Sequence, residues 1–546
     1  EVPGEESILV FSSVGFTKEE VVVGNRTVID LVLTTDVTAL EEIVVIGYGS
    51  IKKSDLTGSI SSVKGEELER TPMQSIDQGL VGRAAGVVVT QTSGMPGATA
   101  SIRVRGTTSL QGGNEPLYVI DGFPIYAGSG YGNTSGTGNR ERISSMATLN
   151  PNDIESIEIL KDASATSIYG ARAANGVVLI TTKTGKAGQD QISFNAYYGV
   201  QEVVQKLDVM NALEYADLVN EAYTNDGDAP YYDNAAMDQI RQNPEGTDWQ
   251  KEVFRSAPTQ NYQLSISGGD KKTRYAISGN ILNQDGIIIG NNFKRYTGRI
   301  NVDRNVMDNV RIGANINLTR TDNEATPATA HSGAVNASLK FNPVMEVYED
   351  EELGLYNLVN APGKLIANPV ATANEMVLEN IATRFLGNTF ADWEFVKGLT
   401  AKITFGVDIF DNKSNTYTPS NIYQSGGTAN ASVRSDLSTT WLNENTLSYI
   451  KDFGTNHSIN AVAGVTFQGS RNEGVLGSSQ DYVNDVLQEN SLESGAVYNQ
   501  PGSDATEWGI ISYLARVNYS LKSKYLMSLA GRIDGSSRFG ENNKYA

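Results

Sequence analysis

The sequence predicts a membrane-spanning β-barrel that follows a compact domain of mixed helices and strands. Three observations support this. Runs of alternating apolar and polar residues recur after about residue 189, and short and long connections alternate between them. No run of about 18 apolar residues is present, so the sequence predicts no membrane-spanning helix. From the pattern alone, a soluble β-sandwich is the alternative, because its strands also alternate.

Composition excludes several classes of function. The chain has 546 residues, no cysteine and two histidines, His331 and His457. Disulfides and cysteine nucleophiles are therefore excluded, and histidine-based zinc sites and catalytic triads are nearly so. The formal net charge of −20 argues against nucleic-acid binding, which needs positive charge at the phosphates. We expect no enzyme active site, no cofactor and no metal.

Residues 1–36 predict the last strands of a small β-sandwich whose beginning lies upstream. The β-favouring runs 8–11, 21–23 and 28–33 are separated by glycine turns, and together they are too short to bury a core. The chain starts without methionine or a leader and stops directly after a predicted strand. We therefore expect a fragment of a longer protein.

Residues 37–55 predict an extended segment followed by a polar linker. Ile43, Val44, Val45 and Ile46 are four successive β-branched residues, which favour an extended backbone. A short exposed strand of this kind can add to the sheet edge of a partner. An ordinary buried strand is the alternative, and the pattern alone favours it.

Residues 56–187 predict a compact α+β domain. Helix-compatible segments at 65–70, 75–83 and 163–174 alternate with strand-like runs. The acidic positions Asp153, Glu155 and Glu158 do not form a hydrolase pair, because Glu155 and Glu158 fall on opposite faces of a strand. A glycine-rich loop at 128–132 lacks the lysine and the strand–helix frame of a phosphate-binding loop.

Residues 188–546 predict the barrel wall, with strands of about ten residues. Apolar residues alternate with polar ones from Leu399 to Ile409, as lipid and lumen faces require. The turns at 268–270 and 396–398 are tight, whereas 201–258, 321–381 and 470–506 are predicted to be long loops. Aromatic residues near strand ends resemble interfacial girdles: Tyr197, Tyr198, Tyr262, Tyr275, Phe395, Tyr449 and Tyr519.

Several motifs stand in order along the chain: IRVRG at 102–106, LYVIDG at 117–122, NPNDIESIEILKD at 150–162, YGARAANGV at 169–177 and RIDGSSRFG at 532–540. The first four resemble plug-domain motifs of SusC/RagA-type TonB-dependent outer-membrane transporters, and the last resembles a mid-barrel motif of that family. Residues 40–49 resemble its TonB box, and residues 1–36 resemble the end of its carboxypeptidase-regulatory-like sandwich.

The resemblance implies a fold and a function. It implies a 22-stranded barrel, of which about ten or eleven candidate strands are present, so we expect a truncation within the barrel because half a barrel would leave unpaired edges in lipid. It implies TonB-dependent active import across the outer membrane of a Gram-negative bacterium. The expected substrate is an oligosaccharide rather than a peptide, and the expected partner is a SusD-like surface lipoprotein that acts as a lid. A soluble glycan-binding protein would leave the plug motifs unexplained, and a passive porin would need neither plug nor box.

The resemblance also assigns residues to roles. Glu42, Ile43, Val44, Val45 and Ile46 correspond to the TonB box, which pairs with TonB by strand addition. The plug arginines are expected to seat the plug against carboxylates of the barrel wall: Arg103, Arg105 and Arg172. Tyr126 and Tyr131, in an apex loop of the plug, are expected to face the substrate.

Overall fold

The computed structural model describes most of residues 58–546, with gaps at 72, 109–112, 126–142, 328–332, 359–365, 423–426, 455, 523, 543 and 546. Before residue 58 it describes 8–11, 19–25, 28–29, 31–32, 43–45, 47 and 50–52. Four short strands lie there: β1 (Ile8–Phe11) pairs with β2 (Glu19–Val22), and β3 (Ile43–Val45) pairs with β4 (Ser50–Lys52). Among the described helices, none is long and apolar enough to cross a membrane.

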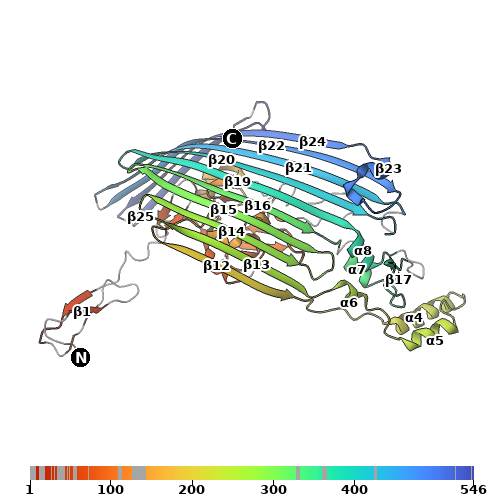
Figure 1. Ribbon diagram of the computed structural model, residues 1–546. Helices are drawn as coiled ribbons and strands as arrows, with labels where there is room; N and C mark the ends of the chain where they lie inside the picture. Colours follow the sequence, from red (N-terminus) through yellow and green to blue (C-terminus); the bar gives the residue numbers. More distant parts are fainter. Residues whose placement is uncertain are drawn as a thin grey trace.

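A curved antiparallel sheet, here called the wall, dominates the structure (Figure 1). Each main strand pairs with the next along the chain, and β23 (Gly495–Tyr498) pairs with β22. The main strands are β12 (Gly188–Gln201), β13 (Ala257–Gly269), β14 (Thr273–Asp285), β15 (Asn292–Met307), β16 (Val310–Glu324), β19 (Val377–Val396), β20 (Leu399–Thr418), β21 (Asn430–Phe453), β22 (His457–Tyr482), β24 (Gly502–Leu521) and β25 (Tyr525–Ser536).

The wall strands are longer than the sequence predicted. They have between 12 and 26 residues rather than about ten. The 26 residues of β22 span roughly 85 Å at 3.3 Å per residue, well beyond a hydrocarbon core of about 30 Å. The predicted loop 470–506 is accordingly wrong, since β22 continues to Tyr482 and β24 begins at Gly502. Charged residues such as Arg471 and Glu473 extend the ladder beyond the apolar band.

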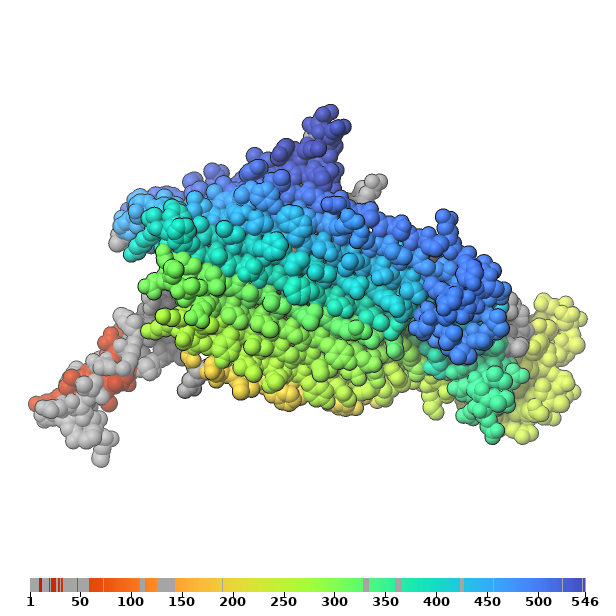
Figure 2. All heavy atoms as spheres, turned by 45° about the horizontal axis from the view of Figure 1, so that its top comes forward, coloured from red at the N-terminus to blue at the C-terminus, as the bar shows by residue number. Residues whose placement is uncertain are grey.

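The two ends of the wall differ in their connections. Short turns join β13 to β14, β15 to β16, β19 to β20, β21 to β22 and β24 to β25. The opposite end, here called the long-loop end, carries the connection with α4 (Ala212–Asn225), α5 (Asn234–Gln242) and α6 (Trp249–Val253), and the one with α7 (Ala334–Ser338), β17 (Tyr348–Asp350), β18 (Leu355–Tyr356) and α8 (Pro369–Glu375). In the space-filling view α4 and α5 (yellow-green) extend past the strand ends (Figure 2).

Alternate residues of each wall strand take opposite faces. On β12, Tyr198 is 66% exposed, whereas its neighbour Tyr197 is partly buried on the other face. Tyr262 of β13 is exposed in the same manner as Tyr198. The outward faces carry apolar side chains, and the inward faces carry polar ones that contact the enclosed domain. Tyr197 therefore does not belong to the predicted outer girdle.

The enclosed domain, here called the plug, lies against the concave face of the wall (Figure 1). Its central sheet has the order β5 (Ile60–Lys64), β10 (Ile154–Leu160), β11 (Val177–Thr182), β8 (Leu117–Ile120) and β9 (Phe123–Ile125), with β8 and β11 parallel. A hairpin of β6 (Val87–Gln91) and β7 (Ala100–Val104) adjoins it, with α1 (Gly65–Glu69), α2 (Ile76–Gly79) and α3 (Ala163–Thr166). Its apolar core also takes in wall residues, among them Leu386 and Leu442.

Candidate plug-seating site

Arg295 of β15 is the centre of one contact between wall and plug. Its side chain is 1% exposed, and its Nη1 donates to the carbonyl oxygens of Gln74 (2.7 Å), Ala147 (3.0 Å) and Leu149 (3.0 Å). Ala147 belongs to the 3-10 helix η2 (Ser145–Thr148), and Leu149 follows it. The last carbonyls of a helix lack partners within it, so a buried guanidinium is a suitable donor for them.

Arg384 of β19 reaches the same helix from a second direction. Its Nη1 donates to Ser145 O (3.3 Å) and to Thr148 Oγ1 (3.2 Å). Asp408 of β20 holds the guanidinium in place through two bonds of 2.8 Å. Because Arg384 and Asp408 are 5% and 13% exposed in their side chains, this pair supplies charge-assisted bonds inside a buried interface.

Arg299, four residues after Arg295 on β15, binds the end of plug strand β11. Its Nη2 donates to Lys183 O (2.6 Å) and to the hydroxyl of Thr182. Thr182 in turn donates through its hydroxyl and its amide to the carboxylate of Asp121, at 2.7 and 2.9 Å. The LYVIDG motif therefore ties β8 to β11 at the point where the wall contacts the plug.

The NPND motif forms a polar contact with β13. Asn150 donates to Asp153 (2.9 Å) and to Gln263 Oε1 (3.1 Å), and Gln263 donates back to Asp153 at 3.2 Å. All three side chains are buried. The motif contributes one side of a closed amide–carboxylate network, and the wall contributes the other.

Arg532 and Asp534 of β25 hold the 3-10 segment η4 (Ser167–Ala173). Arg532 donates to Ile168 O at 2.8 Å and pairs with Asp534 at 2.7 Å. Gly170 lies against this pair with φ of +72°, and a Cβ built on it would lie 2.0 Å from Asp534 Oδ2. The glycine of the YGARAANGV motif is therefore required by close approach of the wall as well as by its backbone conformation.

Of the predicted plug arginines, the structure brings Arg172 to the wall. Arg172 donates through Nη1 to the amide oxygen Oε1 of Gln468 on β22. The side chains of Arg103 and Arg105 are exposed in the described part of the chain, and the structure does not bring them to the wall. A seating role for these three arginines stays a prediction.

The TonB-box prediction lies partly outside the described residues, because Glu42 and Ile46 are not among them. Ile43, Val44 and Val45 form β3, in register with Lys52, Ile51 and Ser50 of β4. Just beyond the box, a Cβ built on Gly47 would lie 3.0 Å from Ile168 Cγ2 and 3.6 Å from the Tyr169 ring. The segment after the box therefore contacts η4. Tyr126 and Tyr131 also lie outside the described residues.

The sequence analysis did not single out the wall arginines, although the alternation of side chains between the two faces of a strand could have identified them. On β15, Tyr296 and Ile300 are exposed apolar positions, so Arg295 and Arg299 must face the plug. Near β15 the plug is held by wall cations that bond plug backbone carbonyls, a kind of contact the sequence analysis did not anticipate. The ends of plug helices and strands present carbonyl oxygens, so the cations belong on the wall.

A buried carboxyl lies behind the contacts of Arg295. Asp77 of α2 is 1% exposed and accepts a hydrogen bond from the Ser144 hydroxyl. Burial raises the pKa of Asp77 to about 7, and the charge of Glu115 adds to the rise while the Ser144 bond opposes it. The group is therefore partly protonated near neutral pH.

A polar cavity of about 710 Å³ separates the plug from β12–β15. The plug side includes Lys64, Glu69, Glu155 and Lys183, and the wall side is largely serine, asparagine and glutamine. Charged plug residues here face mostly uncharged wall residues, and Arg299 is the charged wall residue among the lining. Among the described residues, no group of three or more His, Asp or Glu side chains is placed to hold a metal ion.

Comparison with known proteins gives consistent results. The family model described as TonB-dependent Receptor Plug Domain matches residues 52–177. The TonB-dependent receptor P3 of Formosa agariphila is 38% identical over 100% of this chain and 52% of its own length. The TonB-dependent receptor SusC of Bacteroides thetaiotaomicron is 30% identical over 98% of this chain and 53% of its own.

Among solved structures, the RagAB peptide importer in its open-open state superposes with a TM-score of 0.78. It is 29% identical and covers 92% of this chain and 57% of that chain. The chain spans about half the length of the curated relatives it matches.

Proposed function

The chain belongs to the SusC/RagA-type TonB-dependent receptors, and from this premise we propose that the full-length protein imports a nutrient across the outer membrane of a Gram-negative bacterium, with TonB as the source of force. The seating of the plug supports this most strongly. Wall arginines hold plug backbone carbonyls through a few discrete polar contacts, such as those of Arg295 and Arg532. Such contacts close the lumen and can be broken one group at a time.

A path for the force supports the same proposal. Gly47, directly after the box, lies against Ile168 and Tyr169 of η4. The Ile168 carbonyl is the group that Arg532 holds. Tension applied at β3 therefore reaches a wall contact through a few residues, and the polar cavity beside β12–β15 offers a hydrated route once the plug shifts.

We propose an oligosaccharide as the nutrient, taken up with a SusD-like surface lipoprotein that covers the long-loop end. Tyrosines there supply faces on which sugar rings can stack: Tyr231 is 42% exposed, and its ring centroid lies 5.4 Å from Tyr223 and 4.9 Å from Tyr232. A peptide is the competing substrate, because the RagAB relative is described as a peptide importer. Uptake of labelled glycans and peptides by the full-length protein and its lipoprotein would separate the two.

A proline substitution in the box tests the proposal. Val44→Pro removes a backbone donor from β3, so we expect loss of uptake with unchanged insertion into the outer membrane. Ile51→Pro is the matched control, because it alters the β4 partner and leaves the backbone donors of the box intact. Normal uptake by Val44→Pro would contradict the proposal. Uptake that survives a protonophore would identify a passive porin instead.

A further inference from the structure

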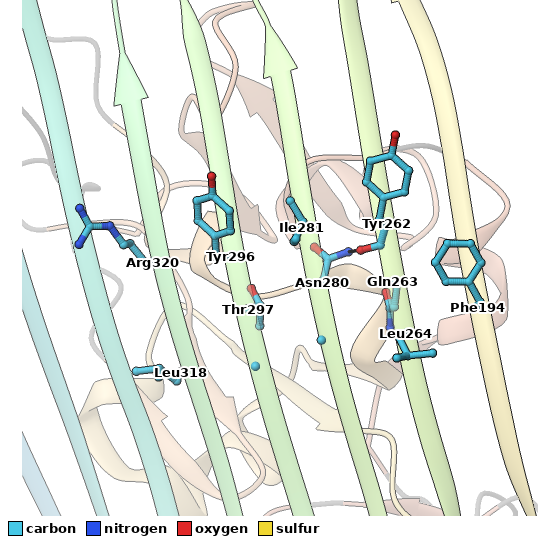
Figure 3. Close-up of a pocket in the computed structure, with 12 residues that line it drawn as sticks. Phe194, Tyr262, Gln263, Leu264, Asn280, Ile281, Tyr296, Thr297, Leu318 and Arg320 are labelled. Atoms are coloured by element: carbon cyan, nitrogen blue, oxygen red, sulfur yellow. Dashed lines mark hydrogen bonds between the residues drawn. The ribbon is translucent and has the colours of Figure 1, made fainter.

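The outward face of the wall has a hollow of about 480 Å³ over β13–β16 (Figure 3). Its floor is one row of cross-strand neighbours: Leu264, Gly279, Gly298 and Leu318. The row on the short-turn side is entirely isoleucine: Ile266, Ile277, Ile300 and Ile316. Two adjacent glycines in an otherwise large apolar surface therefore create the depression, whose volume falls within the range of ligand pockets.

Nothing in the wall fills the space above the glycines. A Cβ built on Gly279 or on Gly298 would meet no atom within 4 Å. The flanking Leu264 and Leu318 are 49% and 51% exposed. An apolar hollow of this kind, on a surface that faces hydrocarbon, fits the bent or branched part of an acyl chain.

The rim of the hollow toward the long-loop end is polar. It is the row Tyr262, Ile281, Tyr296 and Arg320. The hydroxyls of Tyr262 and Tyr296 point in the direction in which β14 and β16 run, which is toward the long-loop end (Figure 3). Aromatic hydroxyls and an arginine directly above an apolar row are typical of the level of lipid headgroups.

Arg320 carries a positive charge on this rim. Its side chain is exposed, and neither of its cross-strand neighbours, Tyr296 and Thr383, is a carboxylate residue. In the next row toward the long-loop end, Lys294 lies opposite Asp322, so those two charges offset each other. An arginine on a lipid-facing strand favours an anionic headgroup, and its guanidinium can bind phosphate through two parallel hydrogen bonds.

We propose that this hollow binds a phosphorylated glycolipid of the outer leaflet, with one acyl chain over Gly279 and Gly298 and a phosphate held by Arg320 and the adjacent tyrosine hydroxyls. The inference rests on the proposed function only in that the long-loop end faces the cell exterior. The bound lipid fills a gap in the apolar band and fixes the height of β13–β16 in the membrane.

The test uses the full-length protein in detergent, with purified lipid A and enzymatically dephosphorylated lipid A as probes and native mass spectrometry as the readout. Gly298→Leu places an apolar side chain in the hollow, and its Cβ would meet no atom within 4 Å. We therefore expect the binding of both lipids to weaken about ten-fold or more. Arg320→Gln removes the phosphate contact, so we expect about ten-fold weaker binding of lipid A and unchanged binding of the dephosphorylated form.

Matched controls keep the result specific. Gly531→Leu makes the same change on the exposed face of β25, outside the hollow, and Arg304→Gln removes a charge at the short-turn end of β15. Both should bind lipid A as the unaltered protein does. Equal binding of lipid A by Gly298→Leu and the unaltered protein would overturn the proposal. If that variant instead lowered self-association of the protein, the occupant of this face would be a second copy of the chain. Failure of the transport proposal would instead appear as normal uptake by Val44→Pro, a result that leaves the binding of lipid A unchanged.

Discussion

Replacing Arg295 by methionine should loosen the plug without unfolding the wall. The side chain of Arg295 is buried, and its Nη1 donates toward three carbonyl oxygens of the plug. One Nη1 carries two hydrogens, so these contacts count as about two full bonds. At about 1.5–3 kcal/mol for each charged hydrogen bond, the variant should lose about 3–6 kcal/mol of plug seating.

Protease sensitivity of the plug measures this loss. When plug opening is fast relative to cleavage, the rate follows the population of the open form, so 3–6 kcal/mol corresponds to about 10²–10⁴-fold faster cleavage. The assay would use the full-length protein in detergent and score the first cuts in residues 58–187. Arg304→Met is the control, since Arg304 lies on the same strand and is exposed. Equal cleavage rates for Arg295→Met and the unaltered protein would refute the reasoning.

Three further predictions use the same protease assay. Gly170→Ala places a Cβ where Asp534 lies and strains a backbone at φ +72°. The strain alone should lower the stability of plug seating by about 1–3 kcal/mol, and the protease should cut η4 first. Unchanged cleavage near residue 170 would contradict this prediction. Asp408→Asn leaves the buried Arg384 without its counter-charge, so the stability of plug seating should fall by about 3–5 kcal/mol. If the variant resists protease as well as the unaltered protein does, the ion pair contributes nothing to plug seating. The pKa of Asp77 is raised to about 7, so plug stability should be greatest below about pH 4, fall by roughly 4 kcal/mol as the pH rises to 7, and stay level above that pH. Asp77→Asn should remove this pH dependence. If protease protection of the unaltered protein does not change between pH 4 and pH 7, the prediction is wrong.

Much of the wall could be predicted from the sequence because lipid imposes a period of two on every strand. Its strand lengths could not, since the ladder continues where the outward residues become charged, as at Arg471 and Glu473. The alternation of apolar and polar residues indicates which face of the sheet a residue occupies. A change from apolar to charged residues on the outward face indicates only where the hydrocarbon core of the membrane ends. The predicted length of about ten residues was the length of the alternating apolar and polar runs, which is shorter than the strands of the structure.

The plug motifs could be recognised from the sequence, but their wall partners could not. Arg532 and the Ile168 carbonyl are 364 residues apart, and Arg295 and the Leu149 carbonyl are 146 apart. A carbonyl acceptor leaves no trace in the residue type that carries it. Only the donor is visible in the sequence, and it is visible as an inward-facing arginine on a strand whose outward residues are apolar.

The arrangement of these contacts implies an order of release. Arg532 holds the Ile168 carbonyl next to the segment that Gly47 contacts. Under the function proposed above, force applied at residues 43–45 would therefore load this contact first. Arg295 and Arg384 both hold η2, which lies in a different part of the plug and is fixed from two wall strands. Each contact is worth a few kcal/mol, and breaking them in turn requires less force at any moment than breaking them together. The region around η4 should therefore yield while η2 stays in place, so that the plug rearranges within the lumen before any loss of the contacts on β15 and β19.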